Sequence, residues 1–266
     1  MSINLRMIKT AIITGASKGI GNELAILFAK DGHNLVLIAR SGKELDNLKQ
    51  QLEEEYNVTV HILIKDLSKP ESAQSVFDEL KAINVEVDYL VNNAGFGDYG
   101  AFTDCEWDTY EKMITLNVTT LTHLCHLFIK EIKGRKPGRI LNVSSTAAFQ
   151  PGPMMAVYFA TKSYVLSLSE AIGYELRKDN ITVTTLCPGP TSTNFGEVSG
   201  MNASQLVKNI RIASSKDVAE LGYKAMMKGK STVIHGTQNK LAPFGIRFIP
   251  RKWVTRLSAK VMGNSV

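Results

Sequence analysis

The sequence has no apolar run of the roughly 18 residues that a membrane-spanning helix requires. Its start, MSINLRMIKTAIITG, runs directly into a strand-like segment and has neither the apolar stretch nor the small-residue cleavage site of a signal peptide. Cys105, Cys125 and Cys187 are an odd number of cysteines and have no metal or redox spacing. These absences predict a cytoplasmic protein with reduced thiols and without a metal site.

Acidic residues are absent from the last part of the chain. Residues 221–266 contain nine Lys and Arg and no Asp or Glu, whereas the whole chain has a formal net charge of +6. The first 220 residues therefore carry −3, which is +6 minus +9. The basic excess belongs to the C-terminal part, and because no nucleic-acid-binding module is evident, no nucleic-acid partner is expected.

Long uniform segments are also absent, and strand-like and helical stretches alternate instead. The chain of 266 residues is 44% hydrophobic and 21% charged, an ordinary globular composition without repeats or linkers. Segments rich in Val, Ile and Leu lie at residues 9–15, 34–40, 58–67, 87–95, 138–145, 181–189 and 231–236. Strands of this kind are buried on both faces. The pattern predicts one α/β domain over residues 1–266, a doubly wound sheet of about seven parallel strands with helices on both faces.

The first predicted strand ends in the glycine-rich stretch TGASKGIG, residues 14–21. Glycines permit a tight turn and close approach of the backbone to a pyrophosphate, and the following helix N-terminus favours phosphate. The predicted cofactor-binding residues here are Gly15, Ser17, Lys18, Gly19, Ile20 and Gly21. A glycine-rich turn without a ligand is the alternative interpretation.

The end of the second predicted strand bears on the choice of cofactor. An NAD site carries an acidic residue there, but this sequence reads Ala39, Arg40, Ser41. Arg40 and Lys18 are two cations that favour a 2′-phosphate, and therefore NADP (NADPH) over NAD. The alternative is that both are ordinary solvated cations.

Four motifs carry a family resemblance: TGASKGIG, NNAG at residues 92–95, NVSS at 142–145 and YFATK at 158–162. With them, the sequence resembles the short-chain dehydrogenase/reductase family over about residues 9–236. The resemblance implies a single-domain Rossmann-type fold and a catalytic set of Asn117, Ser145, Tyr158 and Lys162, with Ser145 matching the family serine better than Ser144. It also implies cofactor contacts from Asp66, Leu67, Asn93, Ala94, Gly95, Tyr158, Lys162, Pro188, Gly189, Thr191 and Thr193.

The spacing of Tyr158 and Lys162 places a phenol and an ammonium on one face of a helix. Taken alone, the two residues are more often an ordinary surface pair. A free tyrosine has a pKa near 10, and a neighbouring ammonium favours the phenolate and lowers that pKa. The prediction is that Tyr158 exchanges a proton with the substrate, Lys162 lowers its pKa and binds the ribose, and Ser145 polarises the carbonyl. Asn117 is expected to help hold a water molecule beside Lys162.

The predicted function is NADPH-dependent reduction of a ketone or aldehyde to an alcohol, reversible in principle. Candidate substrates include 3-oxoacyl thioesters and steroid-like lipophilic carbonyls, and the alternative is a catalytically silent dinucleotide-binding regulator. The family resemblance implies a homodimer or homotetramer and a substrate-closing loop within residues 191–212. The residues after about 237 form a basic, amphipathic extension. It is expected to cap the pocket or a partner subunit, with peripheral membrane contact as the less favoured alternative.

Overall fold

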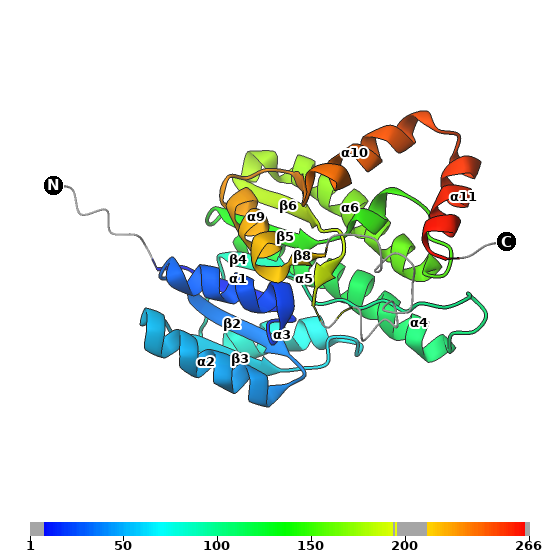
Figure 1. Cartoon of the computed structure of the whole chain (residues 1–266). Coiled ribbons are helices and arrows are strands. Elements are labelled where there is room, and N and C mark those ends of the chain that lie inside the picture. The colour runs from blue at the N-terminus through cyan, green and yellow to red at the C-terminus, as the bar shows by residue number, and fades with distance from the viewer. Residues whose placement is uncertain (1–7, 194, 196–211, 264–266) are drawn as a thin grey trace.

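The computed structural model describes residues 8–193, 195 and 212–263 of the chain. At its centre, seven parallel strands form a sheet in the order β3-β2-β1-β4-β5-β6-β9 (Figure 1). The strands are β1 (Thr10–Thr14), β2 (Asn34–Ala39), β3 (Val60–Ile64), β4 (Tyr89–Asn92), β5 (Gly138–Val143), β6 (Ile181–Cys187) and β9 (Thr232–Ile234). The predicted doubly wound α/β sheet is confirmed.

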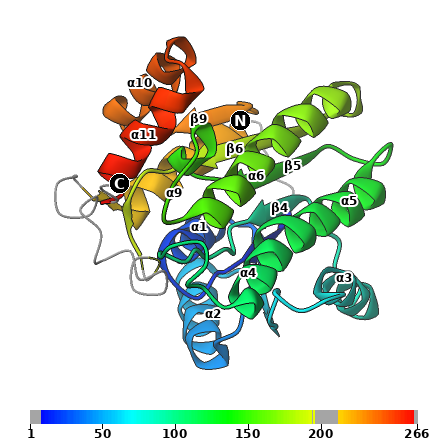
Figure 2. The same cartoon turned by 90° about the vertical axis from the view of Figure 1, so that its right-hand side faces the viewer.

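Helices cover both faces of this sheet (Figure 2). One face carries α1 (Gly19–Lys30), α2 (Gly42–Tyr56) and α9 (Ser215–Met227), and the other carries α3 (Ser72–Ala82), α5 (Leu121–Ile132) and α6 (Ala156–Glu175). Side chains of each strand alternate between the two cores: Ala11 and Ile13 pack with the first layer, and Ile12 with the second. Strands buried on both faces explain the near-continuous apolar runs in the sequence.

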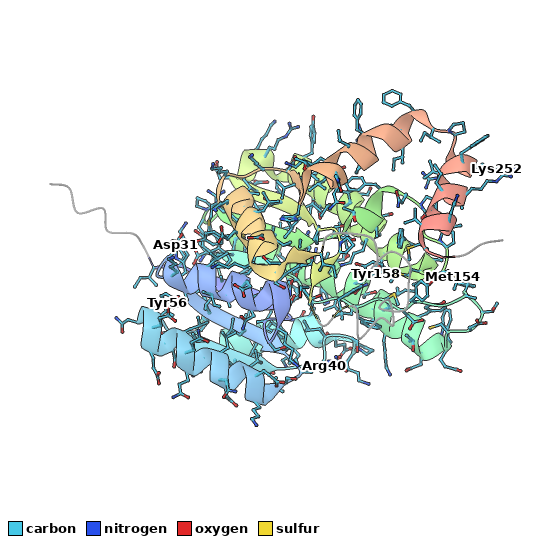
Figure 3. All side chains as sticks on the ribbon, viewed as in Figure 1. Asp31, Arg40, Tyr56, Met154, Tyr158 and Lys252 are labelled. Carbon is cyan, nitrogen blue, oxygen red and sulfur yellow. The ribbon has the colours of Figure 1, made fainter. Side chains whose placement is uncertain are left out.

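The strand order reverses at β1, because β2 and β3 lie on one side of it and β4, β5, β6 and β9 on the other. Ligands of open α/β sheets bind at such a reversal, outside the carboxyl ends of the strands. Figure 3 shows Arg40 and Tyr158 toward that end, away from Asp31 and Tyr56, which mark the far ends of α1 and α2. The fold thus brings the predicted functional residues to one edge.

Residues 107–132 form a long helix with an irregularity that the sequence did not reveal. It consists of α4 (Trp107–Ile114), a π-helical turn η1 (Thr115–Thr120) and α5. Wider turns of this kind occur mostly as single bulges within α-helices, frequently at functional sites. Asn117 lies within the π-helical turn and is buried.

The C-terminal part leaves the sheet after β9. It forms α10 (Thr237–Gly245), the short turn η5 (Ile246–Phe248) and α11 (Arg251–Val261), which extend along one end of the molecule (Figure 1). None of the helices in the described ranges is long and apolar enough to span a membrane. Most of the predicted substrate-closing loop, residues 194 and 196–211, lies outside the described residues.

Candidate active site

The turn between β1 and α1 has the backbone of a phosphate cradle. Gly15 and Gly19 have φ values of +66° and +59°, a conformation that glycine adopts without a steric cost. Helix α1 begins at Gly19, and no side chain of the described residues caps its N-terminus. Its first N–H groups are therefore free to bind an anion, and a dinucleotide pyrophosphate fits this turn.

Close packing explains another glycine of the turn. A Cβ atom on Gly21 would lie 2.3 Å from the Gly15 carbonyl oxygen and 2.6 Å from Nδ2 of Asn93. The remaining predicted residues of the turn also lie at the start of α1, with Ile20 in the core and Ser17 half-buried. The turn therefore tolerates no side chain where helix and strand meet.

Lys18 lies in this turn and Arg40 follows β2, and both cations are exposed. Their role in binding a 2′-phosphate stays a prediction. The structure adds an acidic residue that the strand-end pattern missed: Glu44, in the first turn of α2, lies 3.6 Å from Lys18 (Oε1 to Nζ). Its position four residues after Arg40 was visible in the sequence, but the pairing with Lys18 was not. Glu44 therefore competes with any bound phosphate for the charge of Lys18.

Asp66, which follows β3, interacts electrostatically with Arg40. Burial acts to raise the pKa of this carboxyl, but hydrogen bonds from Ser68 and the charge of Arg40 outweigh it, so the pKa lies below its usual value. The Ser68 N–H and hydroxyl both donate to Oδ1 of Asp66, at 3.0 and 2.6 Å. The adjacent Leu67 is buried and accepts a hydrogen bond from the Thr120 hydroxyl through its carbonyl. The turn after β3 is thus held rigid beside Arg40.

The turn after β4 is tied to the glycine-rich turn by its own side chain. Asn93 donates from Nδ2 to the carbonyls of Thr14 and Gly15, at 3.0 and 3.1 Å. The N–H groups of Asn93 and Ala94 both donate to the Thr14 hydroxyl at 3.0 Å. The structure therefore shows the Asn93 amide positioning the phosphate cradle.

Asn117 performs a similar positioning task on the other side of this turn. Its Nδ2 donates to the Phe96 carbonyl at 2.9 Å and to the Thr161 hydroxyl at 3.1 Å, and its Oδ1 accepts from the Phe96 N–H at 3.2 Å. Both amide hydrogens are therefore used by protein groups. A Cβ atom on Gly95 would lie 3.0 Å from Oδ1 of Asn117 and 3.3 Å from Nζ of Lys162, so this turn adjoins the lysine directly.

The two serines that end the NVSS motif have different environments. Ser144 is buried, and its hydroxyl donates to the Lys162 carbonyl at 2.8 Å, which ties β5 to α6. Ser145 is half-buried; its hydroxyl accepts from the Ala147 N–H at 3.1 Å and interacts with Tyr158. This geometry favours Ser145 as the residue that contacts a substrate.

Tyr158 and Lys162 occupy successive turns of α6, and both are buried. The ammonium lies 5.8 Å from the centre of the phenol ring and donates to the Val143 carbonyl at 2.9 Å. Burial raises the pKa of Tyr158 to about 12, against a lowering by the Ser145 hydroxyl. Burial likewise lowers the pKa of Lys162 to about 8. Desolvation therefore dominates the pKa of the phenol in this structure, and the effect of the Lys162 ammonium on that pKa stays a prediction.

The segment after β6 connects the two halves of the site. The Pro188 carbonyl accepts hydrogen bonds from the Thr146 N–H, at 2.9 Å, and from the Ser145 hydroxyl, at 3.5 Å. At the other end of this segment, Thr193 lies against Gly19. A Cβ atom added to Gly19 would lie 2.9 Å from the Thr193 methyl group. Between them, the Thr191 hydroxyl donates to the Gly189 carbonyl, and β7 (Thr191–Ser192) pairs with β8 (Ala213–Ser214). The predicted residues 188–193 thus run from Ser145 to the glycine-rich turn.

An apolar cluster that the sequence did not predict surrounds the phenol. Phe195 lies 5.2 Å from Tyr158 between ring centroids, and Met155 and Phe159 come from the same helix region. Met262, almost at the end of the chain, packs into the cluster, and the Tyr99 hydroxyl donates to its carbonyl at 2.6 Å. No sequence spacing relates Phe195 or Met262 to Tyr158, because only the folded chain brings them together.

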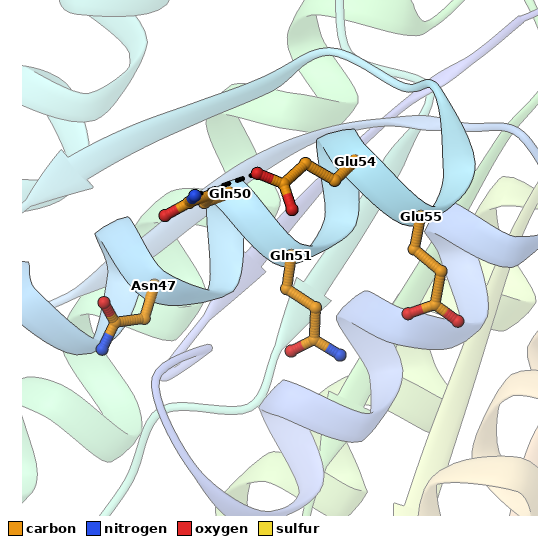
Figure 4. Close-up of a pocket in the computed structure, with 5 residues that line it drawn as sticks. All are labelled: Asn47, Gln50, Gln51, Glu54 and Glu55. Atoms are coloured by element: carbon orange, nitrogen blue, oxygen red, sulfur yellow. Dashed lines mark hydrogen bonds between the residues drawn. The ribbon is translucent and has the colours of Figure 1, made fainter.

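Other features of the described residues do not form part of this site. A polar hollow on α2 is lined by Asn47, Gln50, Gln51, Glu54 and Glu55, which all come from one helix (Figure 4). It joins no residues from different elements and lies away from Tyr158. Within the described ranges, no group of three His, Cys, Asp or Glu is arranged to hold a metal ion.

Comparison with known proteins shows the family to which most of the sequence belongs. Residues 9–203 match the family described as short chain dehydrogenase. A short-chain dehydrogenase from Sphingobium yanoikuyae, solved in complex with NADPH, is 31% identical. The two structures superpose with a TM-score of 0.80 over 90% of this chain and 94% of that one.

Two curated relatives have a hydroxysteroid or a 3-oxoacyl-CoA in their names. The 7beta-hydroxysteroid dehydrogenase of Mediterraneibacter gnavus is 27% identical over 86% of this chain and 86% of that enzyme. The very-long-chain 3-oxoacyl-CoA reductase of Laccaria bicolor is 35% identical over 66% of this chain and 53% of the reductase. The chain thus spans about half the length of this second relative.

Proposed function

The chain belongs to the short-chain dehydrogenase/reductase family of oxidoreductases, and from that premise we propose that it reduces a ketone or aldehyde to an alcohol with NADPH. The observation that carries the proposal is the meeting of Ser145, Tyr158 and Lys162 at the carboxyl edge of the sheet, the edge at which α1 also begins. A catalytically silent regulator would have no need of this complete set.

The residues act on the substrate oxygen through their protons and charges. A bound NADPH supplies the hydride. The Ser145 hydroxyl donates a hydrogen bond to the carbonyl oxygen and polarises it. Tyr158 gives its proton to the same oxygen as negative charge develops there. The ammonium of Lys162, held by the Val143 carbonyl, stabilises the phenolate that remains.

Four groups of residues would hold the cofactor. The start of α1 binds the pyrophosphate through its N–H groups, and Arg40 with Lys18 binds the 2′-phosphate. Lys162 holds the nicotinamide ribose, and residues 188–193 hold the carboxamide. The NADPH complex of the Sphingobium relative supports NADP as the preferred cofactor.

We further propose a lipophilic substrate, such as a steroid or a 3-oxoacyl thioester. Support comes from the apolar side chains around Tyr158, including Met155, Phe159 and Phe195. The names of the two curated relatives point in the same direction. Assembly as a homodimer or homotetramer and a cytoplasmic location stay predictions.

The test follows NADPH oxidation over a panel of ketones of increasing chain length, with wild type and Tyr158→Phe. Loss of a general acid is expected to lower turnover about a hundredfold or more, with NADPH binding retained. Tyr164→Phe is the matched control, because Tyr164 lies on the same helix but is exposed, with its hydroxyl 3.0 Å from that of Thr122. Equal rates in wild type and Tyr158→Phe would refute the catalytic role. NADPH binding without turnover of any ketone would favour the regulator.

A further inference from the structure

The helices at the C-terminus carry seven exposed apolar side chains, which we call the tail face. Its members are Leu241, Phe244, Phe248, Ile249, Trp253, Leu257 and Val261. Phe248 is 76% exposed and Trp253 is 60% exposed. The rings of Phe244 and Phe248 pack against each other, with 5.3 Å between their centroids. Exposed apolar surfaces of this extent mark interaction sites.

Packing of α11 against the rest of the molecule accounts for a different row of side chains. Val254, Ser258 and Met262, spaced four residues apart, are buried against the body. Trp253 and Leu257, each one residue earlier, follow the same spacing but are exposed. The sequence favoured capping of the pocket or of a partner subunit, and capping of the pocket explains the inner row only. Among the residues that the structure describes, nothing covers the tail face.

The charges around the tail face have one sign only. Lys240, Arg247, Arg251, Lys252, Arg256 and Lys260 are all exposed. Residues 221–266 contain no acidic side chain, and within the described part of the chain none of these six cations forms an ion pair. In Figure 3, Lys252 lies on the outer side of α11. A partner for this surface must be apolar and negatively charged at once.

We propose that the tail face docks on the surface of an anionic lipid bilayer. Trp, Phe and Leu side chains flanked by Lys and Arg are the composition of helices that lie in the membrane interface. Lipid phosphates and acidic headgroups complement the six cations, and the acyl region accepts the aromatic rings. A second copy of the chain is a poorer partner, because a two-fold interface would bring the two sets of cations against each other.

Docking in this way places the bilayer beside the apolar cluster around the phenol. The inner row of α11 ends in Met262, which packs in the same cluster as Tyr158 and is held by the Tyr99 hydroxyl. The delivery of a lipophilic carbonyl from the bilayer to this cluster rests on the proposed reductase function. Docking itself does not depend on that function.

The test is flotation of the full-length protein with vesicles of phosphatidylcholine alone or of phosphatidylcholine with phosphatidylserine. Wild type is expected to float with the anionic vesicles and to be released by high salt. Phe248→Ser/Trp253→Ser and Lys252→Glu/Arg256→Glu should each lower the partition coefficient about tenfold or more. The matched controls are Trp107→Ser/Tyr174→Ser, which removes aromatic rings 69% and 70% exposed elsewhere, and Lys81→Glu/Lys178→Glu, at exposed lysines elsewhere.

Circular dichroism and thermal unfolding, measured on every variant, separate loss of docking from loss of the fold without reference to enzymatic activity. Wild type that stays in the bottom fraction with anionic vesicles would overturn the proposal. So would equal losses in the tail variants and their controls. A wild-type dimer that ignores vesicles and dissociates in Phe248→Ser/Trp253→Ser, seen by sedimentation, would make a second copy the occupant and would also overturn it.

Discussion

Replacement of Gly21 by alanine tests the packing of the phosphate cradle. In an unobstructed helix, this change raises the stability by about 0.5–1 kcal/mol, because alanine loses less conformational entropy on folding. At Gly21, however, the new Cβ would lie 2.3 Å from the Gly15 carbonyl oxygen and 2.6 Å from Nδ2 of Asn93. Both obstacles are held in place, Gly15 by a 2.7 Å hydrogen bond to Ile38 and Asn93 by the Thr14 carbonyl.

The clash therefore has to move the turn. Overpacking of this kind costs about 1–3 kcal/mol, which exceeds the gain in helix propensity. The free energy of unfolding is expected to fall by about 1–2 kcal/mol, or roughly 2–4 °C in Tm for a chain of this size. The displaced turn should also weaken NADPH binding, because its N–H groups no longer converge on one point.

Gly173→Ala is the matched control, since Gly173 also lies within a helix. A Cβ atom there would meet Cβ of Val183 at 3.4 Å, an ordinary contact. This variant is expected to be equally stable or slightly more stable, with unchanged cofactor binding. Thermal unfolding and a fluorescence titration with NADPH measure both effects. If Gly21→Ala matched Gly173→Ala in both assays, the reasoning from close packing would be refuted.

Two further predictions concern charge. Arg40→Asp should lower the preference for NADPH over NADH about ten- to a hundredfold. Glu44→Gln should raise this preference, because it frees Lys18 from its ion pair. The measurement is the ratio of kcat/KM for NADPH to that for NADH, and an unchanged ratio would remove both residues from the 2′-phosphate site. With pKa values of about 8 for Lys162 and about 12 for Tyr158, rising pH first removes the charge of the lysine, so kcat/KM for reduction should fall above about pH 8. A profile that stays level up to the ordinary lysine pKa of about 10.4 would contradict this.

Local patterns predicted the fold and the reaction class correctly. Buried parallel strands need near-continuous Val, Ile and Leu, and the glycine-rich turn needs residues that adopt a positive φ at Gly15 and Gly19. Both requirements act on residues close together in the chain. They are therefore visible without the structure, as is the spacing of Tyr158 and Lys162 on one helix face.

The environment of the reacting groups could not be predicted in this way. The sequence suggested that Lys162 lowers the pKa of Tyr158, but burial by remote residues raises it. The sequence also did not predict the ion pair between Lys18 and Glu44, because an ion pair between two elements depends on how those elements pack. A pKa reflects the solvent and charges within a few ångströms, and those are properties of the folded chain.

By itself, the sequence determined the order of strands and helices and the glycine-rich turn, because short-range periodicity and backbone conformation encode them. The assignment of Tyr158 as proton donor, which the family resemblance implies, stays a prediction. Only the tertiary structure decided that Ser145 faces the phenol while Ser144 ties β5 to α6. It also decided that Met262 closes the cluster around Tyr158 while Trp253 and Leu257 stay exposed. The same basic, apolar tail could have buried either row of α11, and packing against the body selected one.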